Sequence, residues 1–501
     1  MIITTEHQKI SPFLNLPIEI LARIINYLEK ISLKEVDELH QLKFARATRT
    51  RQFLNGRFRH YYSALNDSEP ILTSLQSLAC VNRSMEKLCR TWLWKTIKFP
   101  SSLPVPIDTW TEGILPKYGE SVQSLSIYLS VHCLMSPSKV SKSTLYDNTI
   151  RCPNDCDKPT IKDIKSRIAK LNPVSVIRII MQCPNLQILA INLPDKPTPY
   201  QPEDVKRLEN LLIPLVIRLP HLKRLNIMSS SDVSYREEIA SSLVSKIPTL
   251  QSFSFLGRPG NPIPSSSALR APESLSYQLS KLEHLNELEL ALPHFVDSRW
   301  ISHTWPTKLV DLKLILCENL SLNDLYKFIK FFAPTLECLS IAVGLRHLDN
   351  LMHMNQDGFE TDSDGEDDIF NSENDEGIHL NDQYLNHGSS WAENHRLDLP
   401  RLTQLTLFDA KPYGLLKSFQ DCKDITWLVC CQPDWTLIEK LVNSRTWPCL
   451  RFLGLETKDV LFSRYSERNE PTMASEQQAL FADSCRKAGI QLKVMQNFKM
   501  K

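Results

Sequence analysis

The chain has 501 residues, of which 42% are hydrophobic, so it is long enough to form two or three domains with substantial cores. Its 58 lysines and arginines nearly balance its 57 aspartates and glutamates, which leaves a net charge of +1. A protein that binds nucleic acid or an anionic membrane surface through its bulk charge has a more lopsided balance, so neither partner is expected.

Two features predict where the protein is found. The first ten residues, MIITTEHQKI, lack the basic and apolar regions of a secretory signal peptide. The longest apolar run, residues 211–219, falls short of the roughly 20 residues needed to span a bilayer and contains Pro214 and Arg218. We therefore expect a protein of the cytoplasm, the nucleus or both.

Residues 12–28 predict an amphipathic helix. Its apolar residues recur at helical spacing and comprise Ile20, Leu21, Ile24, Ile25 and Leu28. Asn15 is placed to cap the start of this helix, Pro17 suits its first turn, and Glu19 complements the positive end of the helix dipole.

A second helical pattern lies between residues 69 and 97. It predicts a helix that opens at Glu69-Pro70 and a further short helix that closes with Trp92, Leu93 and Trp94. The apolar positions are Ile71, Leu72, Leu75 and Leu78 in the first helix, and Val81, Met85 and Leu88 in the second.

These two stretches, within residues 11–99, resemble an F-box. The resemblance is carried by Leu16-Pro17-x-Glu19-Ile20-Leu21, Ile24, Tyr27-Leu28, Leu78-x-x-Val81-Asn82-Arg83 and Leu93-Trp94. F-box proteins use this small helical hairpin to bind a Skp-type adaptor, which hangs from a cullin in an SCF-type ubiquitin ligase. The alternative is an ordinary helical hairpin that packs onto the following domain.

The resemblance implies which residues contact the adaptor. Interface hot spots are apolar and aromatic groups, and the expected anchors are Leu16, Pro17, Ile20, Ile24, Leu28, Val81, Leu88 and Trp94.

An insertion at about residues 31–71 separates the two halves of the motif. Its segment 43–62 has six cations, five aromatic residues and no acid. In a nucleic-acid-binding protein, such aromatic residues stack on bases and such cations contact the phosphate backbone. We favour the alternative, an insertion helix with packed aromatic residues and solvated arginines.

A short pattern, apolar-x-x-apolar-x-apolar, recurs through residues 100–501. Its instances are Val122-Leu125-Ile127, Leu186-Leu189-Ile191, Leu222-Leu225-Ile227, Leu250-Phe253-Phe255, Leu285-Leu288-Leu290, Leu309-Leu312-Leu314, Leu336-Leu339-Ile341, Leu402-Leu405-Leu407, Ile425-Leu428-Cys430 and Leu450-Leu453-Leu455. Most of the steps between them lie near the period of about 20–29 residues that is typical of leucine-rich repeats. The array resembles the irregular leucine-rich repeats that follow F-boxes.

The same fold is favoured by elementary physics. Each instance alternates like a short strand with one buried face, and proline precedes many of them by two residues. Helical patterns lie between the strands, at residues 203–218, 236–246, 322–332 and 435–442. Strands that alternate with helices predict a parallel sheet with right-handed crossovers. Three buried apolar side chains contribute roughly 5–9 kcal/mol, whereas ordering about 25 backbone residues costs about 25–50 kcal/mol, so repeats must stack into a solenoid.

The fold class is therefore α/β, with a helical F-box hairpin followed by a leucine-rich repeat solenoid. An ordinary doubly wound sheet is the alternative, although the sequence has only 13 glycines and no Gly-rich strand-to-helix turn. At the C-terminus, residues 475–488 predict a helix that Gly489 stops, and residues 490–494 predict a strand that covers the last repeat's edge.

Two loop insertions interrupt the array. The first, at about residues 131–165, contains His132, Cys133, Cys152 and Cys156, whose loose spacing favours a polar loop over a zinc site. The second, at about residues 354–396, contains the acidic segment 357–376, with ten acids and no base, which predicts a disordered loop. Within it Ser363 and Ser372 resemble acidophilic kinase sites, while an inert solubilising loop remains the favoured alternative.

Nothing in the sequence predicts catalysis, a metal site or a cofactor. The thirteen cysteines are scattered, several in apolar runs such as those around Cys183, Cys317, Cys338 and Cys430, and no C-x-x-C pair occurs, which excludes a RING-type zinc domain. We find no nucleophile elbow, phosphate loop or HExxH motif.

The expected function is that of a substrate-recognition adaptor of an SCF-type ubiquitin ligase. Its partners would be a Skp-type adaptor, through it a cullin, and an unidentified target protein held by the repeats. Outward-pointing strand residues, namely Asn226, Ser254, Glu289, Lys313 and Thr406, are mixed in charge and indicate no ligand class. The rival interpretation is a leucine-rich repeat scaffold without any link to ubiquitin.

Overall fold

The structure is a computed structural model that describes residues 16–17, 19–32, 74–99, 107–129, 133, 172–193, 202–229, 237–256, 273–291, 295–305, 308–315, 317, 319–342, 395–408, 415–431, 435–456 and 475–495. Its contacts divide the chain into two compact units. The first unit comprises Met1–Lys98, Pro106–Leu125 and Arg178–Leu186, and the second comprises Phe99–Val105, Ser126–Ile177 and Gln187–Lys501. The first unit therefore takes in short segments from beyond residue 99.

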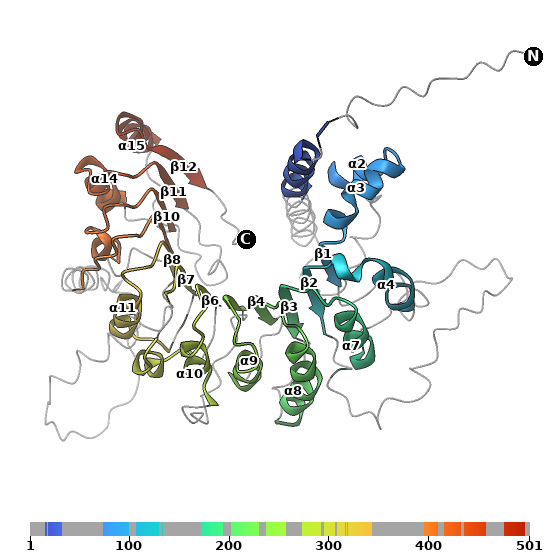
Figure 1. Ribbon diagram of the computed structural model, residues 1–501. Coiled ribbons are helices and arrows are strands. Elements are labelled where there is room, and N and C mark those ends of the chain that lie inside the picture. Colours follow the sequence, from blue (N-terminus) through green and yellow to red (C-terminus); the bar gives the residue numbers. More distant parts are fainter. Residues whose placement is uncertain are drawn as a thin grey trace, which may run out of the picture. The chain divides into compact units, whose positions relative to one another are not determined.

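The first unit is mainly helical (Figure 1). Its elements are a helix over residues 19–32, α2 (Ser74–Ala79), α3 (Arg83–Leu93), β1 (Thr96–Phe99), the π-helix η2 (Thr109–Ile114), α4 (Leu115–Tyr118) and the 3-10 helix η3 (Gly119–Ser121). The Leu21 amide donates to the Pro17 carbonyl at 3.1 Å, so the first helical turn closes on Pro17. Helix α3 begins after Asn82, whose side chain accepts a hydrogen bond from the Met85 amide at 2.9 Å.

The helix over residues 19–32 packs against α2 and α3 although more than 40 residues separate them in sequence. Their shared core contains Ile25, Leu75, Ala79 and Cys89, all less than 10% exposed. The Ser32 hydroxyl oxygen accepts from the Leu75 amide at 2.9 Å. Glu29 forms an ion pair with Lys95 at 3.0 Å. Apolar burial and these two polar contacts join segments that are 43 and 66 residues apart in sequence.

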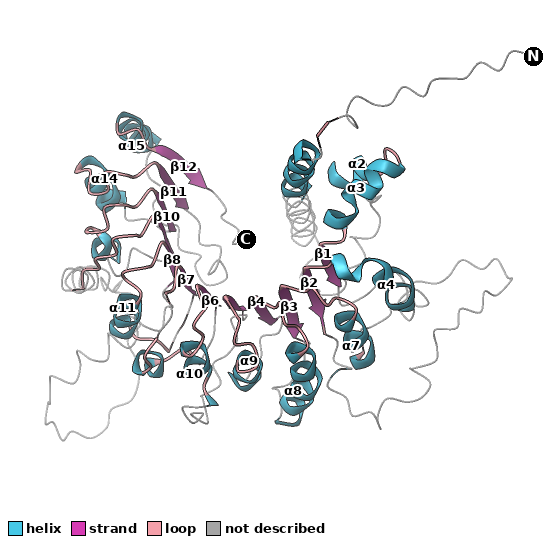
Figure 2. Cartoon of the chain, viewed as in Figure 1, coloured by secondary structure: helices cyan, strands magenta, loops and turns pink. Residues whose placement is uncertain are grey.

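A twelve-stranded sheet follows the chain in strict order from β1 to β12 (Figure 2). The strands after β1 are β2 (Ser124–Tyr128), β3 (Ile188–Leu193), β4 (Arg224–Ser229), β5 (Ser252–Leu256), β6 (Glu287–Ala291), β7 (Asp311–Ile315), β8 (Cys338–Ala342), β9 (Gln404–Phe408), β10 (Trp427–Cys431), β11 (Phe452–Glu456) and β12 (Gln491–Met495). Every pairing from β3 to β12 is parallel.

The pairing register places the repeated apolar residues side by side. Leu225 pairs with Phe253, and the same position continues through Leu288, Leu312, Leu339, Leu405, Leu428 and Leu453. All of these side chains are at most 1% exposed. The residue two positions later forms a second buried row, from Ile191 to Leu455. The core of the second unit is thus a pair of continuous apolar ladders.

Helices connect the strands of the second unit and lie together on one face of its sheet (Figures 1 and 2). They are α7 (Pro173–Met181, shared by both units), α8 (Pro202–Ile217), α9 (Glu237–Val244), α10 (Leu275–Ser280), η7 (Ser298–Ser302), α11 (Leu322–Phe331), η8 (Leu415–Phe419), α14 (Trp435–Asn443) and α15 (Ser475–Lys487). Elements η7 and η8 are 3-10 helices of five residues each, which take the place of the α-helix in their repeats.

The structure confirms the predicted α/β class with a parallel, repeat-like sheet. All ten predicted strand motifs lie on strands of the sheet, and the nine on β3–β11 are in register. The predicted helices at 203–218, 236–246, 322–332 and 435–442 match α8, α9, α11 and α14. Gly489, with a φ of 74°, ends α15 as expected, and β12 pairs with β11. The basic segment 43–62, both predicted phosphorylation sites, Ser363 and Ser372, and most of the insertions at 131–165 and 354–396 lie outside the described residues.

The described cysteines behave mainly as small hydrophobic residues. Cys183, Cys317 and Cys430 are buried and free, as their apolar surroundings predicted, whereas Cys338 is half-buried. Burial raises the pKa of the Cys183 and Cys430 thiols to about 12, so they are unreactive near neutral pH. Among the described residues, no helix combines the length and the apolar character needed to cross a bilayer.

The ladder predicts a strong contrast between neighbouring residues of one strand. Leu405→Ala should destabilise the second unit by about 2–5 kcal/mol, because it opens a cavity in the buried row. Thr406→Ala on the opposite face, which is half-buried, should change stability by less than about 0.5 kcal/mol. Urea-induced unfolding measures both, and similar shifts in the two midpoints would show that this ladder is not the core.

Candidate functional site

The helix over residues 19–32 has two apolar faces. Leu21 and Ile25 point into the hairpin core and are 4% and 1% exposed. Ile20 and Tyr27 are 40% and 66% exposed, and Ile24 is intermediate. At 100° per residue, the face made by Ile20, Ile24 and Tyr27 lies about 100° around the helix from the buried face. The single apolar stripe expected from the sequence is therefore divided between core and surface.

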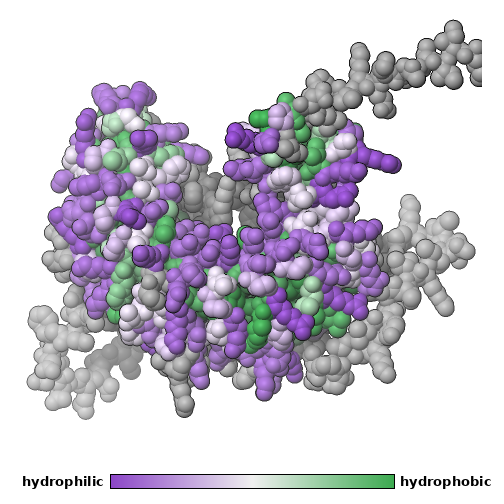
Figure 3. Space-filling model, viewed as in Figure 1, coloured by the Kyte–Doolittle hydropathy of each residue, from purple (hydrophilic) through white to green (hydrophobic). Residues whose placement is uncertain are grey.

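Two further predicted anchors, Pro17 and Val81, also reach the surface. Pro17 is exposed at the start of this helix, whereas its neighbour Leu16 is half-buried. Val81 is 67% exposed and lies in the turn between α2 and α3, so its predicted position inside a helix is wrong. The physical reason is that Asn82, the next residue, caps α3 with its side chain, so the helix begins at Arg83 and leaves Val81 outside it. Figure 3 shows hydrophobic residues at the surface of this helical part of the first unit.

The remaining predicted anchors serve the packing of the hairpin. Leu28 and Leu88 are half-buried against the core formed by Ile25 and its neighbours. Trp94 stacks on Tyr118 with ring centroids 4.6 Å apart and meets Trp110 edge-on. The structure therefore places Pro17, Ile20, Val81 and, in part, Ile24 outward, and it places Leu28, Leu88 and Trp94 largely inward.

Tyr118, on which Trp94 stacks, is held in place by close backbone packing at the next residue, Gly119. A Cβ atom on Gly119 would overlap the carbonyl oxygen of Gln182, so only glycine fits there. The Gln182 amide group donates to the Thr111 carbonyl at 2.6 Å, and the Asn185 side chain donates to the Glu120 carbonyl at 2.8 Å. These contacts hold Tyr118 in place and thereby position the end of α3.

The sheet face opposite the helices is the second candidate surface. Alternation along the strands turns Asn226, Glu289 and Lys313 to this face, where they are half-buried. Thr406 shares this exposure, whereas Ser254 is 6% exposed and donates a hydrogen bond to Glu289 at 3.1 Å. Ser254 is thus occupied in orienting a neighbouring carboxylate and is less available to a ligand than the sequence indicated.

A charged band crosses this face on strands β4, β6 and β7. It consists of Arg224, Glu287, Glu289, Asp311 and Lys313. Arg224 forms an ion pair with Glu287 at 2.5 Å, and Lys313 lies 3.9 Å from Asp311. Three carboxylates and two cations leave a net charge of −1, which suits a partner with a mixed or slightly basic surface.

Asp311 is the least satisfied member of the charged band. One of its carboxylate oxygens is buried and has no hydrogen-bond partner among the described residues. Burial raises the pKa of this carboxyl group above its usual range, and the nearby Lys313 partly opposes the shift. Asp311 is therefore poised to accept a hydrogen bond from a bound group.

Sequence reasoning missed an aromatic pair on the same sheet face. Trp427 on β10 and Phe452 on β11 occupy equivalent positions, and their rings stack with centroids 3.6 Å apart. Trp427 is 43% exposed. A flat aromatic surface of this kind is typical of interface hot spots. A search for aromatic residues immediately before the second apolar position of each motif would have found Trp427 and Phe452.

One contact resembles a nucleophile and its base. His303 Nε2 lies 3.1 Å from the Ser276 hydroxyl, next to Ser274. Ser276 is only 1% exposed, so no substrate can contact it. Glu237 accepts from the Leu275 amide at 2.6 Å, which makes this cluster a polar join between α9, α10 and η7.

In the part of the chain that the structure describes, no cluster of three or more histidine, cysteine or acidic residues could hold a metal ion. A scan against family models and a search of curated proteins each find no match to this chain. The functional argument therefore depends on the residues and on the geometry described above.

The raised pKa of Asp311 predicts a pH-dependent effect on stability. Because the folded-state pKa lies above the usual value, the stability linked to protonated Asp311 is present at low pH and is lost as the pH rises through that pKa. Asp311→Asn should therefore raise the Tm at pH 7 by on the order of 2 °C and have less effect at pH 3.5. Asp424→Asn, at an exposed carboxylate before β10, is the control. An equal Tm change at both pH values for Asp311→Asn would contradict this account.

Proposed function

We propose that this protein is the substrate-recognition adaptor of a cullin-based ubiquitin ligase. The helical hairpin of the first unit would bind a Skp-type adaptor, and the repeat sheet of the second unit would bind the target protein. In such an assembly the gain is one of proximity, because the target's lysines are held near a ubiquitin-charged enzyme. No residue of this chain takes part in the chemistry.

One observation carries the proposal. The motif residues Pro17, Ile20 and Val81 remain exposed although Leu21 and Ile25, on the same hairpin, are buried. A hairpin that only sealed the end of the repeats would gain nothing from a second apolar face, since exposed apolar surface is costly in water. A dedicated helical partner accounts for this face directly.

The hairpin is also rigid enough to act as a docking element. Its halves share one apolar core, and the Glu29–Lys95 ion pair and the hydrogen bond between Leu75 and Ser32 lock their relative position. Preorganisation of this kind lowers the entropic cost of binding. The core can therefore support the exposed residues without change when a partner binds.

The adaptor-binding half is tested by charge insertion on the exposed face. Ile20→Asp with Val81→Asp should weaken binding of a purified Skp-type adaptor by more than about 100-fold, since both residues would be buried in the interface. The Tm should change by only a few degrees, because neither side chain belongs to the core. The control, Asn26→Asp with Lys87→Asp, introduces two aspartates at other exposed positions of the two helices, lowers the net charge by one unit more than the test variant does, and should bind normally.

Two results would reject this half of the proposal. One is retained adaptor binding by the Ile20 and Val81 variant. The other is the absence of binding by the wild-type chain, which would favour the rival function, a leucine-rich repeat scaffold without any link to ubiquitin.

The target-binding half predicts a role for the open sheet face. Trp427→Ser should remove a hot spot on that face, whereas Phe331→Ser removes an equally exposed aromatic residue from α11 on the helical side. In proximity labelling in cells, proteins that accumulate near the wild-type chain when cullin ligases are inhibited should be lost with Trp427→Ser and retained with Phe331→Ser. Equal labelling by both variants would exclude Trp427 from target binding.

A further inference from the structure

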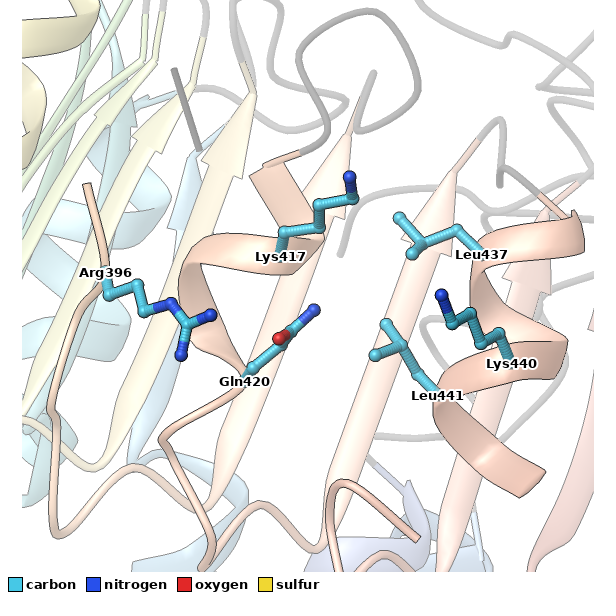
Figure 4. Close-up of a pocket in the computed structure, with 6 residues that line it drawn as sticks. All are labelled: Arg396, Lys417, Gln420, Leu437, Lys440 and Leu441. Carbon is cyan, nitrogen blue, oxygen red and sulfur yellow. The ribbon is translucent and has the colours of Figure 1, made fainter. Parts of the chain in front are cut away.

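A polar pocket of about 320 Å³ opens on the helical side of the second unit, between η8 and α14 (Figure 4). It is lined by Arg396, Lys417, Gln420, Leu437, Lys440 and Leu441. These residues come from three segments: the chain before β9, the turn η8 and the helix α14. The pocket therefore exists only because consecutive repeats stack.

The charge of the pocket is strongly positive. Three of its six lining residues are cations and none is an acid. Arg396 forms an ion pair with Asp421 at 3.7 Å, and both side chains are about half exposed. A further cation, Lys423, donates to the main-chain oxygen of Gln420 at 2.7 Å and adds to the positive potential. Pairing of Arg396 with Asp421 still leaves the positive charges of Lys440, which lines the pocket, and of the neighbouring Lys423.

Donor groups line two sides of the pocket, with the amide group of Gln420 between them (Figure 4). In Figure 4 the guanidinium group of Arg396 and the ammonium group of Lys440 approach the amide group of Gln420 from opposite sides. Leu437 and Leu441 form an apolar wall on the α14 side. A planar guanidinium fork that faces an ammonium group across a small pocket suits an oxyanion with several acceptor oxygens.

We propose that this pocket binds a phosphate group, held between Arg396 and Lys440. A phosphate dianion carries about twice the charge of a carboxylate on three acceptor oxygens, so it gains more from several cations at once. The pocket volume lies at the lower end of the range of about 300–1,000 Å³ for ligand sites, so it suits a phosphate group and not a large cofactor. The site is separate from the proposed adaptor contacts and does not depend on them.

Two sources can supply such a group: a free phosphorylated small molecule or a phosphorylated side chain. This chain itself contains Ser363 and Ser372 within the acidic segment 357–376, whose last residue precedes Arg396 by 20 positions. A chain of that length reaches at most about 70 Å. A phosphorylated copy of that segment is therefore a suitable probe for the second source.

Isothermal titration of the full chain with inorganic pyrophosphate, at fixed ionic strength, tests the site. The wild-type chain should bind saturably at one site, and Arg396→Gln or Lys440→Gln should each weaken binding by about tenfold through loss of a charge-assisted contact. The control is Lys327→Gln, which removes an exposed lysine from α11 and should leave affinity within about twofold. The Ile20→Asp, Val81→Asp variant should bind like the wild type, so failure of adaptor binding and failure of this site are distinguishable.

The proposal is overturned if wild-type binding is not saturable, or if Lys327→Gln weakens it as much as the pocket variants do. Synthetic peptides of residues 357–376 then identify the source. Tighter binding of the doubly phosphorylated peptide than of pyrophosphate would assign a phosphorylated side chain, whereas tighter binding of pyrophosphate would assign a free phosphate ligand. Equal binding of phosphorylated and unmodified peptides would overturn the requirement for phosphate.

Discussion

The structure of the second unit depends on one constraint, the register between parallel strands. Each repeat contributes the same two strand positions to two buried ladders, so Leu405 meets Leu339 on one side and Leu428 on the other. A shift by one residue would turn every one of these side chains to the opposite face and bury polar groups in their place. The connections between strands can vary widely, from long helices such as α8 to single turns such as η8, because they do not change this register.

The same constraint leaves the other sheet face free to carry binding groups. Residues between the ladder positions point away from the core, and neighbouring strands bring them together although, from β3 to β12, paired positions are 23–66 residues apart in sequence. The charged band around Asp311 and the stacked pair of Trp427 and Phe452 both arise in this way. In the first unit, the helix over residues 19–32 likewise has one face in the core and another at the surface, because Ile25 is buried while Ile20 is exposed.

The strands could be predicted because their signal is local. Leu225 and Ile227 are two residues apart, and the alternation holds whatever the neighbouring repeat contains. Strand β1 was missed although Trp94-x-x-Ile97-x-Phe99 fits the motif, because Trp94 is also the last apolar residue of the preceding helical pattern. The sequence could not place Val81, because the Asn82 cap decides where α3 begins. The aromatic pair and the pocket between η8 and α14 depend on contacts between repeats, which no local pattern contains.

The central claim is that the exposed residues of the hairpin form a surface for a Skp-type adaptor while the repeats remain available to a target. Hydrogen–deuterium exchange of the full chain, with and without a purified Skp-type adaptor, tests it most directly, because exchange reports local protection along the whole backbone. The account predicts new protection in peptides covering residues 16–32 and 74–94, with unchanged exchange in β3–β12. Unchanged exchange in the hairpin, or protection confined to the strands, would contradict it.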